Sequence, residues 1–209
     1  MSQNRVQEQA REDSRRQEAP AHSRPRRNRL ATMVMTAMMM CLILVMTILI
    51  RIPIPATEGY IHLGDCMIFL AVLLLGWKWG AVAAGVGSAL ADLIGGFVAY
   101  APITLVVKAV MALVVGLFIS HALKHNAGRG RLLLMEIIGM VLGGAVMCGG
   151  YYLAESIMYG SWVTPLISMA MNTLQFVIGI VIATLLANAL YRTPAARHFT
   201  YRIDEAGRR

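Results

Sequence analysis

Long apolar segments, separated by short turns that contain glycine, proline or charged residues, fill the chain from residue 30 to residue 191. Most of them approach the roughly 20 residues that a helix needs to cross a bilayer. Hydrophobic residues make up 57% of the 209 residues and charged residues only 14%, too few charges to cover a soluble domain of this size. The pattern predicts an all-α integral membrane protein.

Turn signals divide the apolar region into six expected transmembrane helices. The first helix stops before Arg51–Pro55, because two prolines separated by one residue cannot continue a helix. The glycines and tryptophans of residues 76–80 end a short second helix, and Pro102 suits the first turn of the fourth. The expected helices cover residues 30–50, 63–75, 81–98, 102–123, 132–158 and 165–191.

Basic residues predict the orientation of this six-helix bundle. Most of the 19 lysines and arginines lie in the terminal segments or short loops, and Arg51 alone falls in a loop on the predicted outer side. An even number of crossings with basic ends places both termini in the cytoplasm. Residues 1–29 are expected to be a disordered basic tail, residues 30–191 the membrane domain, and residues 192–209 a second basic tail. The net charge of +8 is then an orientation signal, and no nucleic-acid partner is expected.

Sequence motifs for catalysis are absent. The chain has no P-loop, HExxH, GxSxG or dinucleotide fingerprint, so it is not expected to be an enzyme, and active transport would require ATPases from partner subunits. Cys41, Cys66 and Cys148 lack a pairable spacing and are interpreted as packing residues. His121 and His125 have ligand-like spacing but no third ligand, which favours a solvated helix end. No metal or cofactor is expected.

Polar side chains gather in the predicted outer half of the helices. Ionisable groups inside a membrane are costly, so each is a functional candidate. Lys108, for example, lies about 9 Å below the outer surface at 1.5 Å per helical residue. A cluster confined to one half favours a site loaded from outside over a conduction path through the full depth. The candidate substrate-binding residues are His62, Asp65, Asp92, Tyr100, Lys108, Tyr151, Glu155, Trp162, Asn172 and Gln175.

Structural interpretations compete with this functional one. Asp65 can cap the second helix, and Lys108 can pair with Asp92 or extend outward to the interface. His62 suits a loop contact as well as a ligand contact. Asn172 and Gln175 can form hydrogen bonds between helices instead of binding a ligand. Tyr151 and Trp162 can belong to the belt of aromatic residues at the membrane interface.

Several separated motifs occur in a familiar order. They are His62-Leu-Gly-Asp65, Gly87-Ser-Ala-Leu-Ala-Asp92-Leu, Tyr100-Ala-Pro102 with Lys108, Tyr151-Tyr-Leu-Ala-Glu155, and Asn172-Thr-Leu-Gln175. Over residues 30–192 this pattern resembles the substrate-binding S components of energy-coupling factor (ECF) vitamin transporters. It is most similar to the branch linked to hydroxymethylpyrimidine or pyridoxine-type B6 compounds.

The resemblance implies a multi-pass protein of the bacterial cytoplasmic membrane. It would capture a small vitamin or vitamin precursor at the outer face and pass it inward with a T component and two ABC-type ATPases. In this family a small-residue face on the first helix contacts the T component, and Ala37 with Cys41 is the nearest match here. Another vitamin such as pantothenate or riboflavin, a membrane enzyme acting on lipid or isoprenoid, and a scaffold or small channel remain as alternatives.

Overall fold

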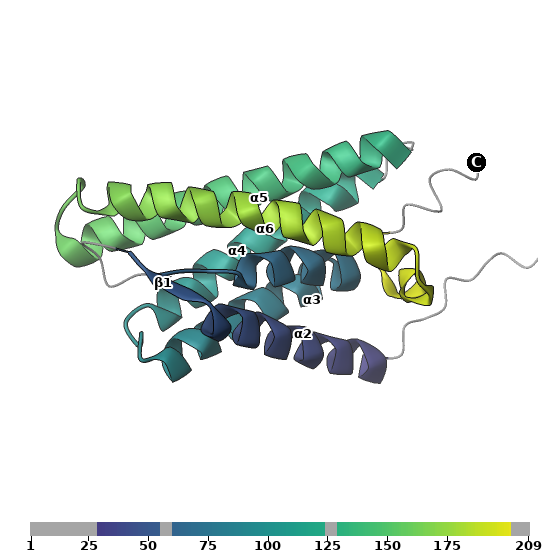
Figure 1. Cartoon of the computed structure of the whole chain (residues 1–209), viewed down its shortest axis with the longest axis horizontal. Coiled ribbons are helices and arrows are strands. Elements are labelled where there is room, and N and C mark those ends of the chain that lie inside the picture. Colours follow the sequence, from purple (N-terminus) through teal and green to yellow (C-terminus); the bar gives the residue numbers. More distant parts are fainter. Residues whose placement is uncertain (1–28, 55–59, 124–128, 202–209) are drawn as a thin grey trace, which may run out of the picture. The chain divides into compact units, whose positions relative to one another are not determined.

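A computed structural model of the chain describes residues 29–54, 60–123 and 129–201. The described residues from Thr32 onward belong to one compact unit. In the described residues, five helices are long and apolar enough to cross a membrane, and Figure 1 shows how they are arranged. The elements are α2 (Arg29–Leu49), β1 (Arg51–Pro53), β2 (Tyr60–His62), α3 (Gly64–Gly95), α4 (Ala101–Leu123), α5 (Arg129–Tyr159), α6 (Pro165–Tyr191) and the 3₁₀ turn η1 (Pro194–His198).

Helix α3 contains both the second and the third predicted helices. The backbone leaves the helical region at Gly76, with φ 79° and ψ 178°. A Cβ atom on Gly80 would lie 2.9 Å from the Cα of Val72, whereas the same residues in a continuous helix are about 12 Å apart. The chain therefore reverses at Gly76. In the part of the chain that the structure describes, five long helices replace the six predicted, because a single non-helical residue stands where a five-residue turn was expected and joins the second and third predicted helices in one element.

Helix α3 lies at the centre of the bundle. It contacts α4 and α6, while α5 packs against both of these helices. Of its most apolar stretch 72% is buried, against 28% to 44% in the other four helices. Large apolar side chains remain exposed on the outer faces of those four, as lipid-facing helices require. The prediction of a membrane-spanning helical protein is confirmed at this level.

Two boundaries differ from those expected. Helix α5 begins at Arg129, so residues 129–131 are helical instead of belonging to a loop. The second half of α3 ends at Gly95, because Gly96 adopts a left-handed conformation with φ 85° and its N–H caps the preceding carbonyls. The N-terminal tail up to residue 28, most of the loop that contains His125, and the last eight residues lie outside the described ranges.

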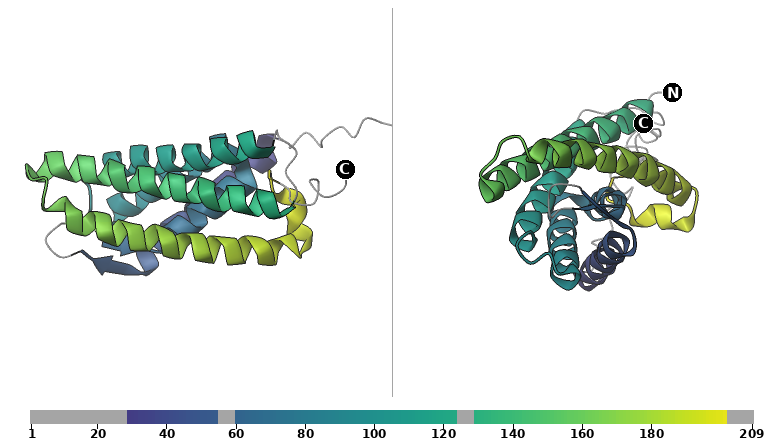
Figure 2. Two further views of the ribbon diagram at one scale, coloured as in Figure 1. Left: turned by 90° about the horizontal axis from the view of Figure 1, so that it is seen from above. Right: turned by 60° about the vertical axis from the view of Figure 1, so that its left-hand side comes forward.

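The two ends of the bundle carry different structures. The Thr32 end of α2 and the Tyr191 end of α6 lie at the same end, which agrees between Figures 1 and 2. At the other end β1 and β2 form an antiparallel hairpin in which Ile52 pairs with Ile61. The arrangement fits termini on one side of a membrane, and the cytoplasmic identity of that side stays a prediction.

The segment after α6 packs on the break in α3 instead of starting a tail at residue 192. The Thr200 N–H and hydroxyl donate to the carbonyl oxygens of Leu73 and Leu74, at 2.7 to 3.2 Å. The Tyr201 hydroxyl donates to the Gly116 carbonyl at 2.9 Å, and its side chain is buried. A helix end leaves carbonyls without partners, so this segment satisfies the ones that the reversal at Gly76 exposes.

Replacing Gly76 with alanine is expected to destabilise the protein. The φ and ψ of Gly76 lie in a region that only glycine adopts readily, and forcing another residue into it costs about 1–3 kcal/mol. The added Cβ would also lie 3.2 Å from Thr200 Cγ2. We expect Gly76→Ala to lower the unfolding temperature in mild detergent, measured by scanning fluorimetry. Gly149→Ala in α5 is the matched control, since no atom lies within 4 Å of its added Cβ. Equal unfolding temperatures for the two variants would contradict the assignment of strain to residue 76.

Candidate functional site

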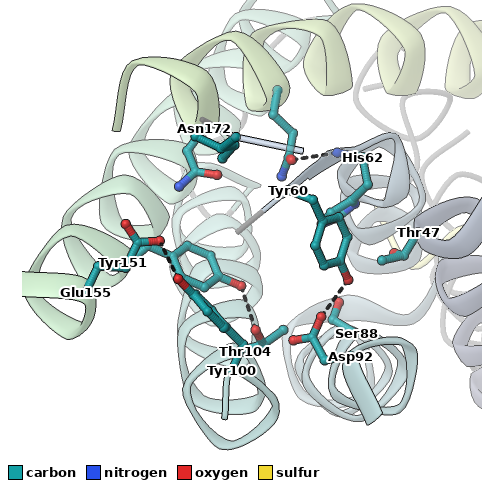
Figure 3. Close-up of a pocket in the computed structure, with 12 residues that line it drawn as sticks. Thr47, Tyr60, His62, Ser88, Asp92, Tyr100, Thr104, Tyr151, Glu155 and Asn172 are labelled. Carbon is teal, nitrogen blue, oxygen red and sulfur yellow. Dashed lines mark hydrogen bonds between the residues drawn. The ribbon is translucent and has the colours of Figure 1, made fainter. Parts of the chain in front are cut away.

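A pocket lies among the helices at the end that carries the β1–β2 hairpin (Figure 3). Helices α2 to α6 and the hairpin all contribute side chains to it. The cavity volume open to the centre of a water molecule is about 30 Å³, room for about two water molecules. The lining residues are Thr47, Ile54, Tyr60, His62, Ser88, Asp92, Tyr100, Thr104, Tyr151, Glu155, Asn172 and Gln175.

Seven of the ten residues singled out in the sequence line this pocket: His62, Asp92, Tyr100, Tyr151, Glu155, Asn172 and Gln175. Tyr151 is buried there, so it is not an interfacial belt aromatic. Asp65 and Lys108 are fully buried beside the pocket. Trp162 is 62% exposed and its ring lies against that of Tyr152, which matches the interfacial alternative.

A buried ion pair lies beneath the pocket. Lys108 Nζ of α4 donates to Asp65 Oδ1 of α3, and both side chains are almost completely buried. The hypotheses that Lys108 pairs with Asp92 or extends outward are therefore wrong. Asp65 stands in the first turn of α3, but its carboxylate serves this pair instead of capping the helix. The physical reason is that a lysine in an apolar interior needs a carboxylate within contact distance.

Gln175 connects the ion pair to the pocket. Its Nε2 donates to Asp65 Oδ2 at 2.7 Å, so both oxygens of that carboxylate have partners. Its Oε1 accepts from the backbone N–H of His62 at 2.8 Å. Gln175 thus provides the interhelical hydrogen bond that the sequence left open, and it also fixes strand β2 to α6.

A cluster around Tyr60 holds the β1–β2 hairpin beside the pocket. The Tyr60 hydroxyl donates to Asp92 Oδ1 at 2.5 Å, and its ring centroid lies 4.5 Å from that of Phe97. The guanidinium of Arg51 lies 4.9 Å from the Tyr60 centroid and donates to the Ala91 carbonyl at 3.0 Å. The hairpin is therefore tied to the C-terminal end of α3 by a hydrogen bond, a cation–π contact and ring packing.

Hydroxyl groups join the remaining walls. The Tyr151 hydroxyl donates to Thr104 Oγ1 at 3.0 Å. The Tyr100 hydroxyl lies 2.8 Å from that of Tyr159 and donates weakly to Glu155 Oε1 at 3.4 Å. Tyr100 and Tyr151 thus present their rings to the pocket between Glu155 and Asp92 (Figure 3).

Five lining residues were missed in the sequence: Thr47, Ile54, Tyr60, Ser88 and Thr104. Hydroxyl residues are common in membrane helices as packing groups, so Ser88 and Thr104 carried no distinct signal. Tyr60 lies two residues before His62, and only the pairing of β1 with β2 brings it to Asp92.

The charges that face the pocket are negative. Asp92 and Glu155 are buried, and no lysine or arginine of the described ranges lines the pocket. Burial, reinforced by the Lys108 charge, lowers the pKa of His62 to about 3, so this imidazole is neutral at pH 7. Among the residues that the structure describes, no group of three histidine, cysteine or acidic side chains is placed to hold a metal.

One family model matches most of the chain. Residues 27–192 match the family described as ECF-type riboflavin transporter, S component. An uncharacterised protein of Pyrococcus woesei is 46% identical over 112 residues, which cover 54% of this chain and 70% of that protein. The thiamine precursor transporter HmpT of Lactococcus lactis subsp. cremoris is 29% identical over 146 residues, covering 69% and 78% of the two chains.

A solved structure shares the fold. It is an S component of a bacterial ECF transporter and aligns with a TM-score of 0.60 over 77% of this chain and 95% of its own, at 17% sequence identity. At that identity the match concerns the fold alone. The family match thus leads to transporter subunits and not to enzymes.

Breaking the buried ion pair is expected to destabilise the bundle strongly. Lys108→Met leaves the Asp65 carboxylate buried without its cation, a change that costs about 3–5 kcal/mol. The double variant Asp65→Asn with Lys108→Met removes both charges and is expected to recover most of the loss. Thermal unfolding in detergent measures both effects. A single variant that unfolds at the wild-type temperature would show that the pair does not stabilise the fold.

Proposed function

The chain belongs to the S components of ECF-type transporters, and we propose that it captures a small vitamin or vitamin precursor in the pocket beside the hairpin. Delivery across the membrane then depends on a T component and two ATPases, since the sequence contains no nucleotide-binding motif. The observation that carries the proposal is the convergence of seven sequence-predicted polar residues on one pocket at one end of a membrane bundle.

The substrate that we propose is a hydroxymethylpyrimidine-type thiamine precursor or a B6 vitamer. HmpT, a thiamine precursor transporter, is similar to this chain over most of both lengths. The lining combines tyrosine rings with several hydrogen-bonding side chains, as a single heteroaromatic ring with hydroxyl or amino groups requires. Riboflavin is the second candidate, because the matching family carries that substrate in its description.

The pocket is proposed to face the outside of the cytoplasmic membrane. Both described ends of the helical bundle lie on the side away from the hairpin, and the chain segments beyond them are rich in arginine, which favours a cytoplasmic location. The hairpin, stiffened by Pro53 and held by Tyr60, would then cover a site that is loaded from outside.

Helix α2 offers the proposed docking face for the T component. Ala37 and Cys41 are both exposed, one helical turn apart on the same face. The buried residues Thr32, Thr36, Met39, Ile43 and Thr47 occupy the other face and pack on the bundle. Small exposed residues permit the close helix approach that drives association in lipid.

The ligand itself is the first test of the function. We expect native mass spectrometry of the protein purified in mild detergent to show a bound pyrimidine or pyridine of vitamin size. Asn172→Ala removes a pocket amide and is expected to weaken binding at least tenfold in isothermal titration calorimetry, by loss of a buried hydrogen bond. Asn188→Ala, about 24 Å further along the same helix, should bind as the wild type does. A protein that binds no vitamin in the panel would contradict the proposed function.

The docking face is tested by a size change. Ala37→Leu is expected to reduce co-purification with the T component and the ATPases while leaving vitamin binding unchanged, because a larger side chain holds the helices apart. Ala145→Leu is the control, since Ala145 is an exposed alanine on α5. Equal loss of the complex in both variants would contradict a specific role for the Ala37 face.

A further inference from the structure

Several buried side-chain oxygens around the pocket have no hydrogen-bond partner. Across the described ranges, five buried side-chain nitrogen or oxygen atoms have no hydrogen-bond partner. Four of these five belong to residues that line the pocket: Thr47 Oγ1, Ser88 Oγ, Asp92 Oδ2 and Glu155 Oε2. An unpaired buried polar atom costs roughly 1–3 kcal/mol, so their concentration at one place indicates that a ligand supplies the missing partners.

The two carboxylates offer different acceptors. Tyr60 already donates to Asp92 Oδ1 at 2.5 Å, which leaves that residue one oxygen. Glu155 accepts a long bond of 3.4 Å from Tyr100 at Oε1 and a further hydrogen bond from the Ser168 side chain, while its Oε2 has no partner. Because each carboxylate oxygen has two lone pairs, Glu155 can still accept two parallel donors, and Asp92 Oδ2 can accept one.

Among the residues that the structure describes, no lysine or arginine side chain lines the pocket beside these two carboxylates. Lys108 is bonded to Asp65, and Arg51 lies against Tyr60 and the Ala91 carbonyl, outside the lining. Glu155 and Asp92 approach the cavity from opposite sides, with the rings of Tyr100 and Tyr151 between them (Figure 3). A buried carboxylate is stable only with a positive or strongly donating partner.

We propose that Glu155 reads the amidine-like edge of an aminopyrimidine, formed by its exocyclic amino group and the adjacent protonated ring nitrogen, while Asp92 accepts a hydroxyl on the opposite side of the ring. This inference rests on the proposed function and deepens it. Two parallel N–H groups match one carboxylate in the same way that an arginine fork does. Anionic vitamins such as pantothenate are rejected, because their carboxylate would face two others.

A pair of analogues that differ at one atom tests the proposal. The probes are 4-amino-5-hydroxymethyl-2-methylpyrimidine and its 4-oxo analogue, in which the amino donor becomes a carbonyl acceptor. The carbonyl faces an oxygen of Glu155, so the wild-type protein in detergent should prefer the amino compound by about 100-fold in calorimetric affinity, as sites built around a hydrogen bond do. An amide at residue 155 both donates and accepts, so Glu155→Gln should reduce this preference at least tenfold.

A second buried glutamate on the same helix serves as the control. Glu136 is 4% exposed, has an unpaired oxygen of its own and does not line the pocket. It lies about 28 Å from Glu155 along α5. Glu136→Gln should therefore leave the ratio of the two affinities unchanged, even where it changes stability. A ratio that falls equally in both variants would overturn the role of Glu155.

The remaining outcomes distinguish a failure of the donor-edge proposal from a failure of the proposed vitamin-capture function. Equal wild-type affinities for the two analogues would overturn the donor-edge proposal, as would tight binding of pantothenate. Binding of riboflavin with neither pyrimidine bound would also overturn it and would leave the vitamin-capture function intact. A wild-type protein that binds none of these compounds and no other vitamin overturns both.

Discussion

The ion pair between Lys108 and Asp65 is the interaction on which the arrangement of the bundle depends. Neither charge is tolerable alone in an apolar interior, and together they bring α4 against the start of α3. Gln175 completes the carboxylate from α6 and extends the connection to the backbone of His62. One buried pair therefore sets the positions of three helices and one strand, and the pocket forms above it.

The reversal of the chain at Gly76 is the second feature on which the position of the pocket depends. Asp65 stands at the beginning of α3 and Asp92 near its end, 27 positions apart, a distance of about 40 Å in a straight helix. Because the chain turns back at Gly76, the two carboxylates arrive at the same end of the bundle. Thr200 and Tyr201 satisfy carbonyls near the turn from the opposite end, so the C-terminal segment supports the geometry of a site that it does not touch.

The sequence could predict which polar residues lie at the same depth in the membrane, because depth follows from a residue's position within its helix. Helix ends and polar positions were readable from Pro102, Pro165 and the apolar runs, and these placed Asp92, Glu155 and Asn172 at one level. The sequence could not predict which side chains pair with one another, because the pairs depend on which helices are neighbours. Lys108 is within reach of carboxylates on α3 by depth alone, and only the packing of α4 on α3 decides for Asp65. Tyr60 was missed for the same reason, since its role requires the pairing of β1 with β2.

The pairing of Lys108 with Asp65, and not with an acid that lines the pocket, affects which ligands the pocket can bind. Had Lys108 paired with Asp92, as the sequence allowed, the pocket would contain a neutralised carboxylate and would suit a neutral or anionic ligand. Because Lys108 forms its ion pair with Asp65 beneath the pocket, Asp92 and Glu155 each keep a carboxylate oxygen without a hydrogen-bond partner. The choice of partner that stabilises the bundle is thus the same choice that leaves an acidic pocket, and a ligand with N–H donors is its natural complement.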